Sequence, residues 1–144
     1  MRKSILLLVV LFFVNFQFVF SQNTLTEPFK IQIISISNIR GYGTGDRAVV
    51  PKKGYKCMLV TLTLTNMSNE NAHVDFNKFI LLDTITKITY KPQAVVANTF
   101  FTLGVRTDKK VKPGDKIVRN VYYFVKKETI VKYFSYKENI YVKE

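Results

Sequence analysis

The stretch VTLTLTNMSNENAHVDFNKFILLD, residues 60 to 83, places two apolar runs on either side of a polar segment. In the first run Val60, Leu62 and Leu64 alternate with threonines, which is the period-two pattern of a strand with one buried and one solvent-facing side. The polar segment is dense in Asn and Ser, whose side chains bond nearby backbone and favour turns. The stretch therefore predicts a long strand that ends at Asn66, a polar loop and a returning strand.

The same alternation is found upstream of this stretch. Phe29, Ile31 and Ile33 alternate with polar residues, and the phase then slips by one, because Ile34 and Ile36 continue the pattern. A bulge, or a strand that changes sheets, would explain the slip. GYGTG and VPKKG, which follow, are typical of loops.

Further strands are expected downstream. The returning strand should bring Phe76, Phe79, Leu81 and Ile85 into the core, and a Pro113-Gly114 turn should precede a long strand. The segment from 92 to 105 fits either a short helix or an irregular crossing. The remaining strands are expected near residues 88–90, 117–125, 130–136 and 139–142. About seven short strands separated by turns predict an all-β protein, an antiparallel β-sandwich of immunoglobulin type.

The first 21 residues read as a signal peptide: a positive start, a long apolar run, and Val19 and Ser21 at a cleavage site. We expect cleavage before Gln22, so that residues 22–144 form one domain that is secreted to the periplasm, the cell surface or the exterior. An uncleaved N-terminal anchor is the alternative. Loss of Arg2 and Lys3 lowers the formal charge from +12 to +10. Such a basic chain favours acidic partners, although the charge would also simply maintain solubility.

The chemistry-bearing residues favour no enzyme. The single histidine, His73, lies in the polar loop beside Asp75, and Ser68 or Ser35 could supply a hydroxyl, but no Gly-x-Ser-x-Gly context surrounds either serine. Carboxylates are scattered among lysines, so neither a glycosidase pair nor a calcium loop is indicated. The lone Cys57 excludes an intrachain disulfide. We expect no catalytic residue, no metal and no cofactor.

One group of basic residues is a candidate binding site. They gather around the Pro113-Gly114 turn, and aromatic residues follow them in the chain; the candidate anion-binding residues are Lys109, Lys110, Lys112, Lys116 and Arg119. Basic side chains with interleaved aromatics can bind anionic polymers by charge and stacking. The competing interpretation is that the aromatics are core and the lysines protect sheet edges from aggregation.

Several of these motifs together resemble a family. KKGYKCMLVTLTLTNMSNENAHVDFNKFILLD and VKPGDKIVRNVYYFV look like the immunoglobulin-like domain of unknown function found in bacterial secreted proteins and lipoproteins, whose fold is similar to that of a secreted mycobacterial immunoprotective antigen. The matching residues are Gly54, Tyr55, Asn66, Ser68, Phe79, Leu81, Asp83, Pro113, Gly114 and Asp115. The resemblance implies a fold and an extracellular setting, and it implies no activity.

The functional hypothesis is a secreted, non-catalytic binding or interaction module at the cell envelope or outside the cell. Its expected partner is an anionic envelope glycan or another extracellular protein, and nucleic acid is disfavoured. Two alternatives stay open: a structural envelope protein without a ligand, and a small hydrolase with a site that the sequence does not reveal.

Overall fold

The computed structural model describes residues 28–44, 47–97, 108–137 and 139–142. Those residues form twelve strands and one short 3-10 helix, η1, and no α-helix. In order, they are β1 (Phe29–Ile39), β2 (Tyr42–Thr44), β3 (Arg47–Val49), β4 (Tyr55–Asn66), β5 (Ala72–Asp75), η1 (Phe76–Lys78), β6 (Phe79–Asp83), β7 (Thr89–Tyr90), β8 (Ala94–Ala97), β9 (Asp108–Val111), β10 (Lys116–Lys126), β11 (Val131–Tyr136) and β12 (Asn139–Val142).

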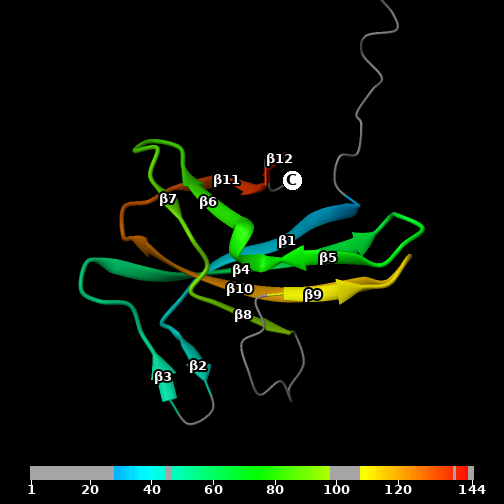
Figure 1. Ribbon diagram of the computed structural model, residues 1–144. Coiled ribbons are helices and arrows are strands. Elements are labelled where there is room, and N and C mark those ends of the chain that lie inside the picture. Colours follow the sequence, from blue (N-terminus) through cyan, green and yellow to red (C-terminus); the bar gives the residue numbers. More distant parts are fainter. Residues whose placement is uncertain (1–27, 45–46, 98–107, 138, 143–144) are drawn as a thin grey trace, which may run out of the picture.

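Two four-stranded antiparallel sheets pack face to face. The first sheet has the strand order β1-β4-β10-β8, and the second has the order β12-β11-β6-β7 (Figure 1). Two small ribbons complete the described part of the chain: β2 pairs with β3, and β5 pairs with β9. The prediction of an antiparallel β-sandwich is confirmed, although the described residues form more strands than the seven expected, because the two ribbons are inserted between strands of the sheets.

The opening stretch crosses from one sheet to the other. Strand β4 is central in the first sheet, between β1 and β10, and it ends at Asn66 as predicted. The returning segment does not pair with β4. It forms β5, which pairs with β9, and then passes through η1 into β6, which pairs with β11 in the second sheet. The polar loop, β5 and η1 together therefore connect the two layers of the sandwich.

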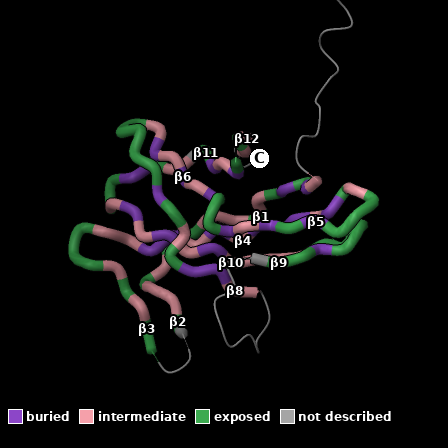
Figure 2. Tube along the Cα trace, viewed as in Figure 1, coloured by how far each residue is buried: buried purple, intermediate pink, exposed green. Residues whose placement is uncertain are grey.

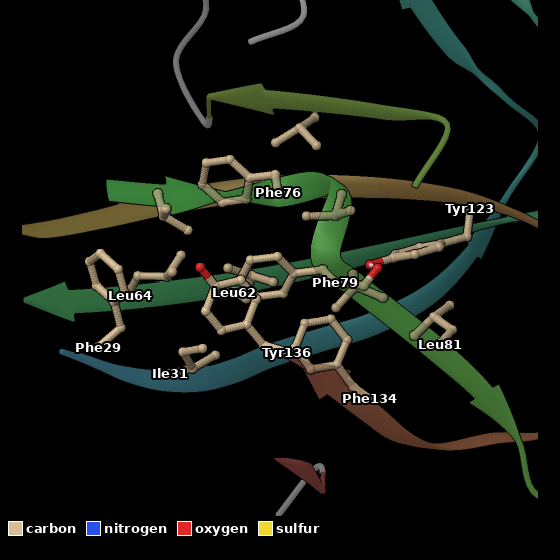
Figure 3. Close-up of a cluster of buried hydrophobic side chains, with 14 of the residues drawn as sticks. Phe29, Ile31, Leu62, Leu64, Phe76, Phe79, Leu81, Tyr123, Phe134 and Tyr136 are labelled. Atoms are coloured by element: carbon tan, nitrogen blue, oxygen red, sulfur yellow. Dashed lines mark hydrogen bonds between the residues drawn. The ribbon is translucent and has the colours of Figure 1, made fainter. Parts of the chain in front are cut away.

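The core lies between the two sheets. Val60, Leu62 and Leu64 on β4 have no exposed surface, which confirms the predicted buried face. Phe79 faces them from β6, and its ring centroid lies 4.3 Å from that of Tyr136 and 5.0 Å from that of Phe134 (Figure 3). Alternating positions of β4, β6, β10 and β11 thus fill the space between the layers.

Three expectations about which side chains are buried differ from the structure. The bulge predicted in β1 is present, since the register with β4 shifts between Ile33 and Ser35, but the extra residue, Ile34, is 54% exposed and does not continue the inward pattern. Ile85 was expected in the core and is 69% exposed, because the chain turns away after Asp83. Thr63, expected on a wet face, is only 4% exposed, since side chains on neighbouring strands flank it.

Two other predictions fall partly or wholly outside the described residues. The ambiguous segment from 92 to 105 contains strand β8, which pairs with β10, while residues 98–107 lie outside. The predicted signal peptide, residues 1–21, also lies outside. In the part of the chain that is described, no helix is long and apolar enough to span a membrane.

Candidate functional site

A buried asparagine fixes the end of the sandwich that carries the predicted basic site. Asn66 is 1% exposed, and its amide nitrogen donates to the carbonyl oxygens of Glu70 at 2.7 Å and Val111 at 2.9 Å. Its side-chain oxygen accepts from the backbone and the hydroxyl of Ser68, at 3.0 and 2.7 Å. One side chain therefore ties the polar loop after β4 to the strand before the Pro-Gly turn.

The backbone of Asn66 holds the Pro113-Gly114 turn directly. The Asn66 N–H donates to the carbonyl of Asp115, and the Gly114 N–H donates to the carbonyl of Asn66, at 3.1 and 2.9 Å. Gly114 has φ +74°, a left-handed conformation that glycine adopts without a steric penalty. The lysines at this turn thus project from a fixed backbone.

Strand register places Lys30, of the first described strand, close to the Pro113-Gly114 turn. Thr65 of β4 lies opposite Lys30 of β1 on one side and opposite Lys116 of β10 on the other, so the three side chains share the outer face of the first sheet. Both lysines are exposed, and Lys112 is exposed in the adjoining turn. We call Lys30, Lys112 and Lys116 the lysine end of the first sheet.

The five predicted anion-binding residues do not form one group. Lys112 and Lys116 belong to the lysine end. Lys109 and Lys110 are exposed neighbours on β9 and point to opposite faces of the β5-β9 ribbon, where Lys110 lies opposite His73 and Lys109 opposite Val74. The positive charge is therefore spread around the turn.

Arg119 lies apart from the lysines, on the core side of the first sheet. It pairs in register with Leu62, and its guanidinium carbon lies 5.9 Å from the ring centroid of Phe76. The guanidinium donates to the carbonyl of Val118 at 2.7 Å, and its partial burial lowers its pKa. Its environment is a cation-π contact at the edge of the core.

Different side chains follow one another along the outer face of the first sheet; Figure 2 colours the residues of its strands by burial. Beyond the lysine end come polar and small side chains, among them Gln32, Ser35 and Ser37 of β1. Thr61 of β4 donates its hydroxyl to the side-chain oxygen of Asn120 at 2.9 Å. This face thus presents hydroxyl and amide groups from three neighbouring strands.

An aromatic cluster closes the far end of the same face. The ring of Tyr42, on β2, lies with its centroid 4.9 Å from that of Tyr122 and 5.9 Å from that of Phe124. Both tyrosines are half-buried. Desolvation is the larger cause that raises their pKa values, and the electrostatic effect of the neighbouring Cys57 raises them further. The Cys57 thiol is fully buried with a pKa raised by desolvation, which disfavours the thiolate that a nucleophile would need.

The residues considered for catalysis lie in three different parts of the fold. His73 lies in strand β5 and not in the loop, and it is exposed beside Lys110. Ser68 is engaged by Asn66, and Ser35 follows the bulge in β1. Within residues 28–44, 47–97, 108–137 and 139–142, no three His, Cys, Asp or Glu side chains are placed to hold a metal ion.

A second polar group, which sequence reasoning missed, lies where β6 ends. Asp83 is 2% exposed, and its carboxylate accepts from the hydroxyl of Thr86 at 2.7 Å and from the backbone N–H of Ile85 at 3.0 Å. Nearby, the Tyr90 hydroxyl lies 2.8 Å from that of Thr129, which is also buried. The bond from Thr86, followed by the bond from Ile85, lowers the pKa of Asp83.

Because the Asp83 carboxylate has a lowered pKa in the folded protein, it should make stability fall with acid. Its contribution is full above the ordinary aspartate pKa of about 4 and is lost as the pH falls through the lowered value. We expect Asp83→Asn to flatten the decline in the free energy of unfolding below about pH 4, measured by urea unfolding across a pH series. Asp115→Asn, at an exposed carboxylate, is the control. Superimposable acid profiles for wild type and Asp83→Asn would contradict this role.

Comparison with known proteins shows what the chain is similar to in fold. A conserved hypothetical protein from Bacillus anthracis has a crystal structure that matches 83% of this chain and 89% of its own, with a TM-score of 0.58 and 19% sequence identity. An uncharacterized β-sandwich protein from Clostridium difficile matches 82% of this chain and 85% of its own, with a TM-score of 0.55 and 14% identity. No family model matches the chain, and no curated protein matches it. At these identities the likeness is one of β-sandwich fold.

Proposed function

We propose that this protein is a secreted, non-catalytic β-sandwich of immunoglobulin-like type that binds an anionic polymer at the cell envelope or outside the cell. The observation that carries the proposal is the strand register that places Lys30 and Lys116 on either side of Thr65, beside Lys112 in the turn. Support for the immunoglobulin-like type comes from the sequence resemblance, whose Pro113-Gly114-Asp115 motif forms the turn at this site.

Spacing and rigidity suit the lysine end to a polyanion. Neighbouring strands lie about 4.8 Å apart, so the backbones of Lys30 and Lys116 are about 10 Å apart, close to the Debye length of roughly 8 Å at physiological salt. Such charges act together on a polymer that passes over them. Binding then releases counterions from the polymer, and affinity falls steeply with salt.

Replacing Lys30, Lys112 and Lys116 together by serine should weaken retention on immobilised heparin. The triple variant should elute at lower salt, and the slope of log affinity against log salt should decrease by up to about one unit for each lysine. Thermal stability should change little, because exposed charges contribute little to folding.

The matched control removes the same charge elsewhere, with Lys53, Lys91 and Lys127, all exposed, replaced by serine. It should elute close to wild type. If both triple variants shift equally, binding follows net charge and not a site. If neither shifts, the lysines only keep the surface solvated, and the structural role without a ligand is favoured.

The proposal also requires export. We expect the mature chain to begin at Gln22, because a charged start, an apolar run and small residues at 19 and 21 precede it. N-terminal sequencing or intact-mass measurement of exported protein tests this. A product that retains Met1 and sediments with membranes would instead support the uncleaved anchor.

A further inference from the structure

We propose that the polymer is an acidic polysaccharide that lies along the outer face of the first sheet, from the lysine end to the Tyr42-Tyr122 cluster. This inference rests on the proposed function for the bound charge, and it adds the chemical class of the ligand and the surface that recognises it. The supporting observation is a continuous set of side-chain rows fixed by strand register.

Each row runs across three neighbouring strands with its side chains on the same face. Going away from the lysine end, the rows are Lys30-Thr65-Lys116, Gln32-Thr63-Val118, Ser35-Thr61-Asn120 and Ser37-Leu59-Tyr122. From Thr65 to Leu59 this face extends about 20 Å along β4 at roughly 3.4 Å per residue. It therefore offers an elongated platform to an extended ligand.

The rows match the groups that an acidic sugar chain presents. Lysine ammonium groups pair with carboxylate or sulfate, while hydroxyl and amide side chains can both donate to and accept from sugar hydroxyls. Gln32 and Ser37 are exposed, and Ser35 and Asn120 are half-buried, whereas Thr63 is buried between its neighbours and offers no accessible hydroxyl. Tyr42 and Tyr122, both half-buried, bring an apolar ring surface to the end of the platform, where the C–H face of a sugar ring can pack.

Other anionic polymers fit this face less well. Single-stranded nucleic acid is held by aromatic side chains on which successive bases stack, whereas the rows between the lysines and Leu59 carry hydroxyl, amide and small aliphatic groups. A polymer of phosphate alone would use the lysines and leave the polar rows without a function.

The opposite outer face of the sandwich shows that the polar rows are particular to the first sheet. On the second sheet, Leu82 lies opposite Tyr133, and Ile80 lies in register with Ser135, which itself faces Ile140. Tyr133 is 38% exposed and Ile140 is 66% exposed. Among its described residues this face carries the polar side chains Ser135 and Thr89 beside these apolar ones, and they do not form rows across three strands as on the first sheet.

The test compares the affinity of the mature protein for four probes by isothermal titration calorimetry at one fixed salt concentration. The probes are heparin, desulfated and re-N-acetylated heparin, inorganic polyphosphate, and single-stranded DNA. We expect heparin to bind more tightly than polyphosphate or DNA of matched charge, with measurable residual binding of the desulfated polymer. Equal or tighter binding of polyphosphate or DNA would overturn the inference.

Two exposed side chains separate sugar recognition from charge. Gln32→Ala combined with Ser37→Ala should lower heparin affinity about tenfold, because each loses a hydrogen-bonding group, and should leave polyphosphate affinity unchanged. Thr89→Ala with Asn77→Ala, exposed positions outside the platform, should change neither. The serine triple variant at the lysine end should bind both heparin and polyphosphate more weakly than wild type.

The two proposals fail in distinguishable ways. The polysaccharide inference is wrong if the Gln32 and Ser37 double variant binds heparin with wild-type affinity, or if its affinity for polyphosphate falls as much as its affinity for heparin. In either case the lysine end can still bind polyanions. If the lysine triple variant binds every probe like wild type, the proposed function itself is wrong.

Discussion

Replacing Phe79 by alanine is expected to lower the free energy of unfolding by about 3 to 5 kcal/mol, the range for a buried phenylalanine truncated to alanine. Phe79 is fully buried where η1 leads into β6, and its ring packs on those of Phe76, Phe134 and Tyr136 at centroid distances of 5.5, 5.0 and 4.3 Å. Its loss would leave a cavity among three aromatic side chains.

Urea unfolding followed by tyrosine fluorescence or circular dichroism measures this effect. The total free energy of unfolding of a small domain is only about 5 to 15 kcal/mol, so the alanine variant could fail to fold. Phe79→Leu then serves as the milder variant. Tyr133→Ala, at a position 38% exposed on the outer face of the second sheet, is the control and should cost much less. Similar losses at Phe79 and Tyr133 would contradict the assignment of the core.

Loss of the Asn66 side chain should be the most damaging polar substitution. Asn66→Ala removes the donors to the carbonyls of Glu70 and Val111, and the bond to Val111 is buried. A buried acceptor left without a donor costs about 1 to 3 kcal/mol, and the bonds to Ser68 are lost as well. We therefore expect the free energy of unfolding to fall by about 3 kcal/mol. The same urea unfolding measurement applies.

Asn66→Asp provides a sharper test, because the side chain keeps its shape while the donating amide nitrogen is replaced by an accepting carboxylate oxygen. A carboxylate oxygen would face two carbonyl oxygens, so burial and repulsion should raise the pKa of the new aspartate above its ordinary value. The variant should therefore regain stability as the pH falls through that raised pKa, opposite to the effect of Asp83. The exposed Asn69→Ala is the control. An Asn66→Asp variant with the wild-type pH profile would contradict the proposed bonding.

Local features of the fold could be predicted from the sequence where periodicity and turn chemistry agree. The buried face of β4, its end at Asn66 and the Pro113-Gly114 turn were all predicted correctly, because they depend on neighbouring residues. The pairing of β6 with β11 could not be predicted, since the alternation at Phe79 and Leu81 fits a strand beside β4 equally well. Only packing of the whole chain decides which sheet receives it.

The candidate site was predicted less completely for the same reason. Lys112 and Lys116 are close in sequence and were both among the five candidate residues, whereas Lys30 reaches them only through its register with Thr65. Arg119 was grouped with them because it is near in sequence, but the strand period places it on the core side, opposite Leu62. In a strand, side chains an even number of residues after Lys116 share its face, and Arg119 is three residues after it. This rule would have placed Arg119 on the opposite face, away from the site.

The burial of Asn66 also bears on how the protein can be produced. Asn66-Met67-Ser68 has the form of an N-glycosylation acceptor, and a eukaryotic secretory pathway would encounter it while the chain is still unfolded. The amide nitrogen that would carry the glycan is the atom that donates to the carbonyls of Glu70 and Val111 inside the folded domain. A glycan there would displace the loop and the turn, so occupancy of this acceptor in such a host and correct folding should be mutually exclusive.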